Sequence, residues 1–184
     1  MSCWACHEPV TGRACVGCGA LQPPPPHPDP FVVFGLAPRW HLDLADLDAR
    51  WKALARQVHP DRFAGRPAAE RRLALAWTAA MNEARRLLRD PTRRAWWLAT
   101  GAPEAPQTGA RVDPAFLAEV FAWREADEEE PGAFARLSAA RRAALEAELD
   151  TVFTAWEEGD GALEAVPSLL HRLQTLKGHA PGVS

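Results

Sequence analysis

Four cysteines lie within the first 18 residues and form two Cys-x2-Cys pairs. The first pair is Cys3 and Cys6, and the second, eight residues later, is Cys15 and Cys18. A Cys-x2-Cys turn brings two thiolates to one side of a tight loop, and two such turns supply the ligands of a tetrahedral zinc site. The spacing therefore predicts one zinc ion held by these four cysteines.

Other features of this segment indicate a structural metal. Gly17 and Gly19 permit the positive φ angles that such turns need. A segment this short has almost no core, so metal binding would supply its folding free energy. Four protein ligands leave no open coordination position, which favours a structural or recognition role over catalysis. Iron in place of zinc and a set of free or redox-active thiols are the alternatives, and His7 would serve only if one cysteine were not a ligand.

The tripeptide His59-Pro60-Asp61 lies between two amphipathic helices. Asp43 is a natural N-cap for the first of them, and Pro60 disfavours helical geometry at the preceding residue, so the helix ends at His59. Its apolar positions recur at helical spacing: Leu44, Leu47, Trp51, Leu54 and Val58. Lys52 and Arg56 fall on the opposite face and Arg62 follows the motif, which predicts a basic surface beside the turn. An ordinary solvated helix face with a proline turn is the alternative.

Helical patterns dominate the rest of the chain. Val and Thr together number 18 and Ile and Tyr are absent, which argues against a large sheet. Periodicity and start signals, including Asp-Pro pairs at Asp90 and Asp113, predict helices over 67–89, 91–101, 113–130, 133–158 and 162–177. The sequence therefore predicts an all-α protein with a small helical domain, a three-helix C-terminal bundle and an N-terminal cysteine module.

The net charge of −3 hides two regions of opposite sign. Residues 31–99 hold 13 Lys and Arg against 7 acids, while residues 100–184 hold 7 against 15. No apolar run is long enough to cross a membrane and no signal segment is visible, so we expect a soluble, cytoplasmic protein. A mitochondrial matrix location would require a transit peptide that has been removed.

Several stretches together resemble a known family. Residues 29–36 (DPFVVFGL), 50–63 (RWKALARQVHPDRF), 81–84 (MNEA) and 90–95 (DPTRRA) are similar to a J-domain. The helix start at residues 113–117 (DPAFL) and the pair Arg124-Glu125 resemble the C-terminal domain of HscB, the J-type co-chaperone of iron–sulfur cluster assembly. The tetracysteine segment running into residues 18–22 (CGALQ) resembles the extension of mitochondrial-type members.

The resemblance implies a domain order and a mechanism. It implies a four-cysteine metal-binding module over 1–22, a Pro-rich linker over 23–30, a J-domain over 31–101, a linker over 102–110, and an HscB-type oligomerisation and scaffold-binding bundle over 111–178. The J-domain would stimulate the ATPase of a DnaK- or HscA-type chaperone. The residues that match this contact are His59, Pro60, Asp61, Lys52, Arg56 and Arg62.

The bundle would bind an IscU-type scaffold protein that carries the nascent cluster. The residues that match this contact are Leu117, Phe121, Arg124 and Glu125. Ordinary core packing is the alternative for Leu117 and Phe121. The sequence departs from the family at two places. Ala122 stands where the family has an acidic contact residue, and His171-Arg172-Leu173 stands where the family often has an aromatic residue.

Other functional classes fit the sequence less well. A zinc-ribbon nucleic-acid-binding protein would need basic residues on the knuckles, but residues 1–30 carry one Arg and two acids. A general J-protein with another client is the remaining alternative. No nucleophile–base pair, phosphate loop or open metal site is visible, so the sequence does not predict an enzyme.

Overall fold

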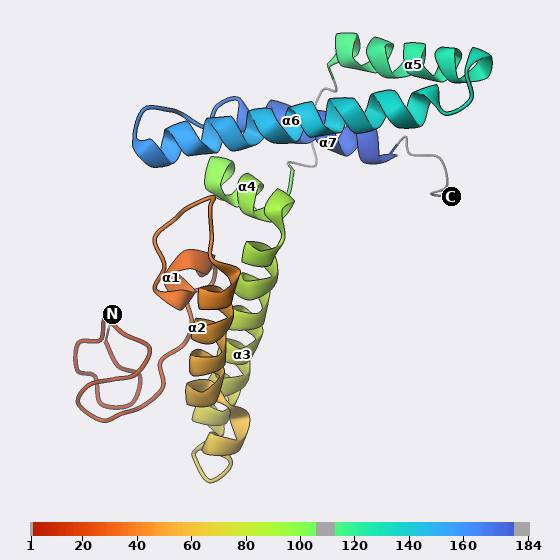
Figure 1. Cartoon of the computed structure of the whole chain (residues 1–184). Coiled ribbons are helices and arrows are strands. Elements are labelled where there is room, and N and C mark those ends of the chain that lie inside the picture. Colours follow the sequence, from red (N-terminus) through yellow and green to blue (C-terminus); the bar gives the residue numbers. More distant parts are fainter. Residues whose placement is uncertain (1, 106–112, 179–184) are drawn as a thin grey trace. The chain divides into compact units, whose positions relative to one another are not determined.

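The computed structural model describes residues 2–105 and 113–178. Within these residues the chain is all-helical, with two isolated β-bridges (Ser2 with Pro9, Ala14 with Leu21) and no strand. The predicted fold class is therefore confirmed (Figure 1). The elements are α1 (Pro30–Phe34), α2 (Leu44–Val58), the 3-10 helix η1 (Pro60–Phe63), α3 (Ala68–Arg89), α4 (Pro91–Thr100), α5 (Pro114–Glu129), α6 (Ala133–Glu158) and α7 (Val166–Gly178).

The chain divides into two compact units, with the boundary after Pro91. In the first unit α2 and α3 form an antiparallel hairpin, and the short helix α1 packs against both (Figure 1). Asp43 caps α2 as predicted, accepting hydrogen bonds from the backbone N–H groups of Ala45 and Asp46. The buried side chains of the hairpin include Leu47, Leu54, Val58, Trp77, Met81, Ala84 and Leu88.

Two residues of the predicted α2 core stripe lie at its margin. Leu44 remains 40% exposed in the first turn of the helix. Trp51 is half-buried, donates from its indole N–H to Asn82 Oδ1 at 2.9 Å and lies under the Arg85 guanidinium. Periodicity gives the direction of a side chain, while burial also depends on how far the neighbouring helix extends.

The second unit contains a bundle in which α6 packs against both α5 and α7 (Figure 1). Gly132, with a φ of 94°, turns the chain between α5 and α6, and Asp127 Oδ1 accepts from the backbone N–H groups of Gly132 and Phe134. The last helix begins at Val166 instead of the predicted residue 162. Pro167 accounts for the difference, because a proline is tolerated only in the first turn of a helix.

Among the described residues, every helix is too short or too polar to traverse a lipid bilayer.

Candidate functional site

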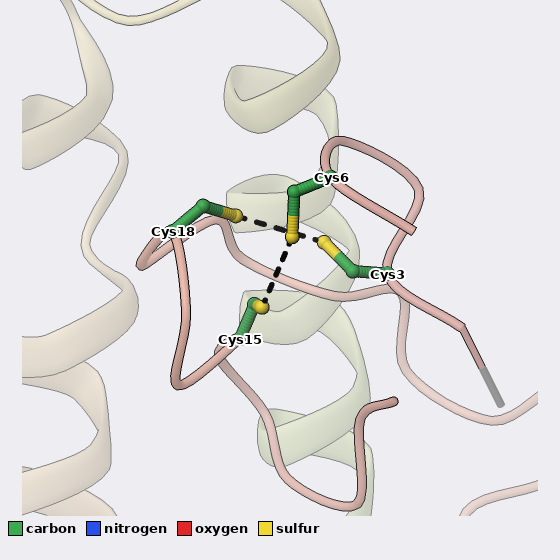
Figure 2. A group of neighbouring side chains, drawn as sticks. All are labelled: Cys3, Cys6, Cys15 and Cys18. Atoms are coloured by element: carbon green, nitrogen blue, oxygen red, sulfur yellow. Dashed lines mark hydrogen bonds between the residues drawn. The ribbon is translucent and has the colours of Figure 1, made fainter. Parts of the chain in front are cut away.

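The four cysteines converge on one point. Their Sγ atoms all lie within 4.8 Å of one another, with Cys3 and Cys18 separated by 3.7 Å and Cys6 and Cys15 by 3.6 Å (Figure 2). All four are free thiols rather than disulfides. Sulfur atoms placed about 2.3 Å from a central zinc ion in a tetrahedron lie about 3.8 Å apart. The cluster therefore has the size and donor set of a tetrahedral thiolate metal site.

The electrostatics of the cluster favour a cation at its centre. Burial raises the pKa of the Cys3 thiol, but hydrogen bonds from the backbone at Cys6 and Ala5 outweigh it and lower that pKa to about 6. The pKa of Cys6 is raised to about 12, because the neighbouring thiols and burial outweigh a backbone hydrogen bond at Glu8. Ionisation of one cysteine thus disfavours ionisation of its neighbours, and a bound cation would remove this repulsion between thiolates.

The two knuckles repeat one backbone design. The N–H of His7 donates to the carbonyl of Cys3 at 3.0 Å, and the N–H of Gly19 donates to that of Cys15 at 2.9 Å. His7 and Gly19 both adopt positive φ, 66° and 72° respectively. The expectation for Gly17 was wrong, because only the residue after the second cysteine of each pair takes the left-handed conformation. His7 therefore supplies the left-handed backbone turn after Cys6, and it is not one of the four clustered ligand residues.

The His-Pro-Asp segment forms the turn at the end of α2. His59 caps η1, since its Nδ1 accepts from the backbone N–H of Asp61 at 3.3 Å, and its ring lies 3.4 Å from an Asp61 carboxylate oxygen. The side chains of His59 and Asp61 are 57% and 90% exposed. Lys52, Arg56 and Arg62 are exposed as well, and Arg62 donates to the backbone carbonyl of Arg56 at 3.1 Å. The six residues matched to the chaperone contact thus lie on the second half of α2 or in the turn that follows it.

A network that the sequence did not predict attaches the cysteine module, residues 2–22, to the helical hairpin. The guanidinium of Arg13 donates to Gln57 Oε1 at 3.2 Å and to the Val33 carbonyl at 3.4 Å, and lies 5.0 Å from the centre of the Trp77 ring. The indole N–H of Trp77 donates to the Gln22 carbonyl at 2.7 Å. Gln22 in turn donates from its side chain to Cys3 Sγ at 3.3 Å, so the network reaches a candidate metal ligand.

The candidate scaffold contact is a ridge on α5. Phe116, Val120 and Trp123 are buried as the stripe predicts, while Phe121 is 54% exposed and Leu117 is half-buried. Phe121 is therefore not a core residue. Arg124 and Glu125, beside it, are exposed. We call the four residues Leu117, Phe121, Arg124 and Glu125 the contact ridge.

The residues that depart from the family pattern on α7 have partners inside the second unit. His171 makes an edge-on contact with Trp96, with ring centres 5.1 Å apart. Arg172 donates to Asp113 Oδ2 at 2.7 Å and lies over the Phe116 ring. Arg172 thus fastens the start of α5 to α7.

Asp113→Asn is expected to lower the melting temperature of the second unit by a few degrees at neutral pH, since asparagine can still cap α5 but cannot pair with Arg172. The hydrogen bond from Arg172 holds the pKa of Asp113 below its usual range. The ion pair therefore stabilises the fold above the ordinary aspartate pKa of about 3.9 and loses this effect as the pH falls through the lowered value. The melting temperatures of the unaltered chain and of Asp113→Asn should converge on acidification. The control Glu146→Gln, at an exposed position, should melt at the same temperature as the unaltered chain at either pH.

Comparisons with known proteins give a consistent result. No protein-family model matches the chain. It is 45% identical over 116 residues to the HscB co-chaperone homologue of Bordetella pertussis, covering 60% of this chain and 68% of the relative. It is 38% identical over 151 residues to the homologue of Burkholderia mallei, covering 76% and 85%.

Two solved structures share the fold. The crystal structure of human co-chaperone protein HscB superposes with a TM-score of 0.75 at 27% identity, covering 97% of this chain and 94% of the human one. HscB from Vibrio cholerae superposes with a TM-score of 0.57 at 24% identity over 82% of this chain and 92% of the other, which shows the fold alone.

Proposed function

The chain belongs to the HscB co-chaperone family, and from this we propose that it stimulates the ATPase of a DnaK- or HscA-type chaperone and delivers to it an IscU-type scaffold protein during iron–sulfur cluster assembly. Members of this family are co-chaperones and not enzymes. The observation that carries the proposal is the exposed His59-Pro60-Asp61 turn at the end of a basic helix. The two sequence relatives, from Bordetella pertussis and Burkholderia mallei, are bacterial, which supports a cytoplasmic location.

The charge on the first unit suits an acidic partner surface. Lys52, Arg56 and Arg62 are exposed around the His-Pro-Asp turn. Exposed charges of one sign speed diffusional encounter with a surface of opposite sign and make the association salt-sensitive. We infer that these three cations orient the chaperone so that His59, Pro60 and Asp61 contact the region that controls ATP hydrolysis.

The contact ridge on α5 suits a modest, transient interface with the scaffold. Phe121 offers a large exposed apolar side chain, half-buried Leu117 lies one turn before it, and Arg124 and Glu125 place charges at its edge. An aromatic anchor with a polar rim is the usual composition of an interface centre.

We propose that the cysteine cluster holds zinc as a structural ion. Cys3, Cys6, Cys15 and Cys18 would be its ligands, and the ion would cross-link the two knuckles. The separation of the thiols and the absence of a disulfide among them support this assignment.

One reconstitution tests the proposed function. The purified chain should bind a DnaK- or HscA-type chaperone in its ATP state, raise the single-turnover rate of ATP hydrolysis, and raise it further together with an IscU-type scaffold. A chain that binds neither protein, or that binds both without changing the ATPase rate, would refute the proposal.

Replacing Leu117 and Phe121 with alanine together is expected to weaken scaffold binding by about tenfold or more while changing the melting temperature little, because interface energy is concentrated in a few apolar anchors. Isothermal titration with the scaffold and thermal melts measure the two effects. Leu75→Ala is the matched control, since Leu75 is 58% exposed on the first unit. A large loss of melting temperature with unchanged scaffold affinity would make the pair core residues instead.

A further inference from the structure

The cysteine module and the end of α2 enclose a cleft of about 260 Å³ in the first unit. Its walls come from two segments far apart in sequence. The module contributes Arg13, Ala14 and Leu21, and the region around the His-Pro-Asp turn contributes Gln57, Arg62 and Arg66. A side chain or two of a partner protein would fill such a volume.

The cleft is basic. Three of its lining residues are arginines, and none of the described residues that line it carries a carboxylate. Arg13 is held by its own contacts with Gln57, Val33 and Trp77, and Arg62 uses one N–H on the Arg56 carbonyl. The side chain of Arg66 is exposed and has no hydrogen-bond or ion-pair partner within residues 2–105 and 113–178. The cleft therefore has cationic groups available for an anion.

The module wall is fixed rather than loosely tethered. Arg13 joins it to Gln57 on the last turn of α2, and Trp77 of α3 donates to the Gln22 carbonyl. The backbone N–H of Gln22 donates to the Arg13 carbonyl at 2.8 Å, so the two attachment points support one another. A wall held by several contacts from both helices of the hairpin keeps the shape of the cleft.

We propose that this composite cleft binds an acidic segment of the partner chaperone, so that the cysteine module contributes directly to chaperone binding. The cleft shares Arg62 with the proposed chaperone contact and adjoins the His-Pro-Asp turn, so a chaperone docked at that turn lies next to the cleft. Charge complementarity favours a segment rich in aspartate and glutamate. The proposal rests on the proposed function, because its occupant belongs to that chaperone.

The decisive variant places a negative charge on the module wall. Ala14 lines the cleft and is exposed, so Ala14→Glu should leave the fold intact while repelling an acidic segment. Val16 is fully exposed on the same module and does not line the cleft, so Val16→Glu carries the same charge change as a matched control. Affinity for the ATP-bound chaperone should fall about three- to tenfold for Ala14→Glu and stay unchanged for Val16→Glu.

A second pair of variants tests the opposite wall. Arg66→Glu should weaken chaperone binding by a similar factor and reduce its salt dependence, whereas Arg39→Glu, which reverses an exposed charge before the start of α2, should not. Metal content and melting temperature, measured on every variant, verify that the module stays folded.

The outcomes separate this proposal from the function on which it rests. The cleft proposal is overturned if the unaltered chain stimulates the chaperone while Ala14→Glu binds it as tightly as Val16→Glu does. It is also overturned if Ala14→Glu and Arg66→Glu weaken binding to a single-stranded oligonucleotide but not to the chaperone. Failure of the unaltered chain to stimulate the chaperone would refute the proposed function instead.

Discussion

Replacing His59 with glutamine is expected to return the ATPase rate of the partner chaperone to its basal value while leaving the fold intact. The imidazole is 57% exposed, so its loss removes little buried area. Its Nδ1 accepts from the Asp61 N–H, and the glutamine side-chain oxygen can take over that role at the start of η1. The variant therefore changes the exposed side chain that would contact the chaperone and leaves the backbone conformation of the turn unchanged.

Single-turnover ATP hydrolysis and a thermal melt, measured on the same preparation, check this expectation. His27→Gln is the matched control, because His27 is exposed in the same unit at a distance in sequence from α2. Asp61→Asn should lose the stimulation in the same way, because Asp61 belongs to the same turn. It should also keep the fold, since the Asp61 side chain is 90% exposed and outside any core. Retained stimulation by His59→Gln would contradict the co-chaperone mechanism. A melting temperature that falls together with the stimulation would contradict the surface role of His59, because unfolding would then account for the loss.

The helices could be predicted because their signals are local. Asp43 before α2, the Asp-Pro pair before α5 and Gly159 after α6 each act within one turn of the helix end that they specify. The five-residue helix α1 and the 3-10 turn η1 are too short to display a period, and no helix was predicted for either segment from periodicity. Their formation depends on caps and on packing against the α2–α3 hairpin.

The candidate sites also differ in whether local sequence or tertiary packing brings their residues together. The cysteine cluster could be predicted because two short turns bring the ligands together. The attachment of the module could not, because Arg13, Gln22 and Trp77 have no sequence spacing in common and meet only in the folded unit. The contact ridge lies between these cases, since helical spacing puts Leu117 and Phe121 beside the core but only the bundle shows that Phe121 is exposed.

Removal of the metal is expected to unfold the cysteine module and leave the helices in place. The buried cluster of the module consists of Cys3, Val10, Cys15 and Ala20, and two of these are ligands. Val10, Ala20 and Leu21, the buried apolar side chains of the module that are not candidate ligands, are too few to offset the conformational entropy of about 20 ordered residues. Structural zinc in small modules contributes on the order of 10 kcal/mol, so the bound ion must supply the free energy of folding.

Trypsin gives a local measurement of this unfolding. The Arg13 guanidinium is held by Gln57, Val33 and Trp77 while the module is docked, so cleavage after Arg13 should be slow in the metal-loaded chain and fast once a chelator has removed the ion. Cleavage after Arg39, exposed before the start of α2, should proceed at the same rate in both states and serves as the control.

The same treatment should leave the helical circular dichroism nearly unchanged, because the α2–α3 hairpin and the α5–α7 bundle have apolar cores of their own. Cys15→Ser should reproduce the metal-free cleavage pattern without a chelator, and metal analysis of the unaltered chain should find about one zinc ion, as four thiolates in one tetrahedron require. An Arg13 bond that stays protected in metal-free protein would show that docking on Trp77 and Gln57 holds the module without the ion. The cysteines would then have a role other than structural support.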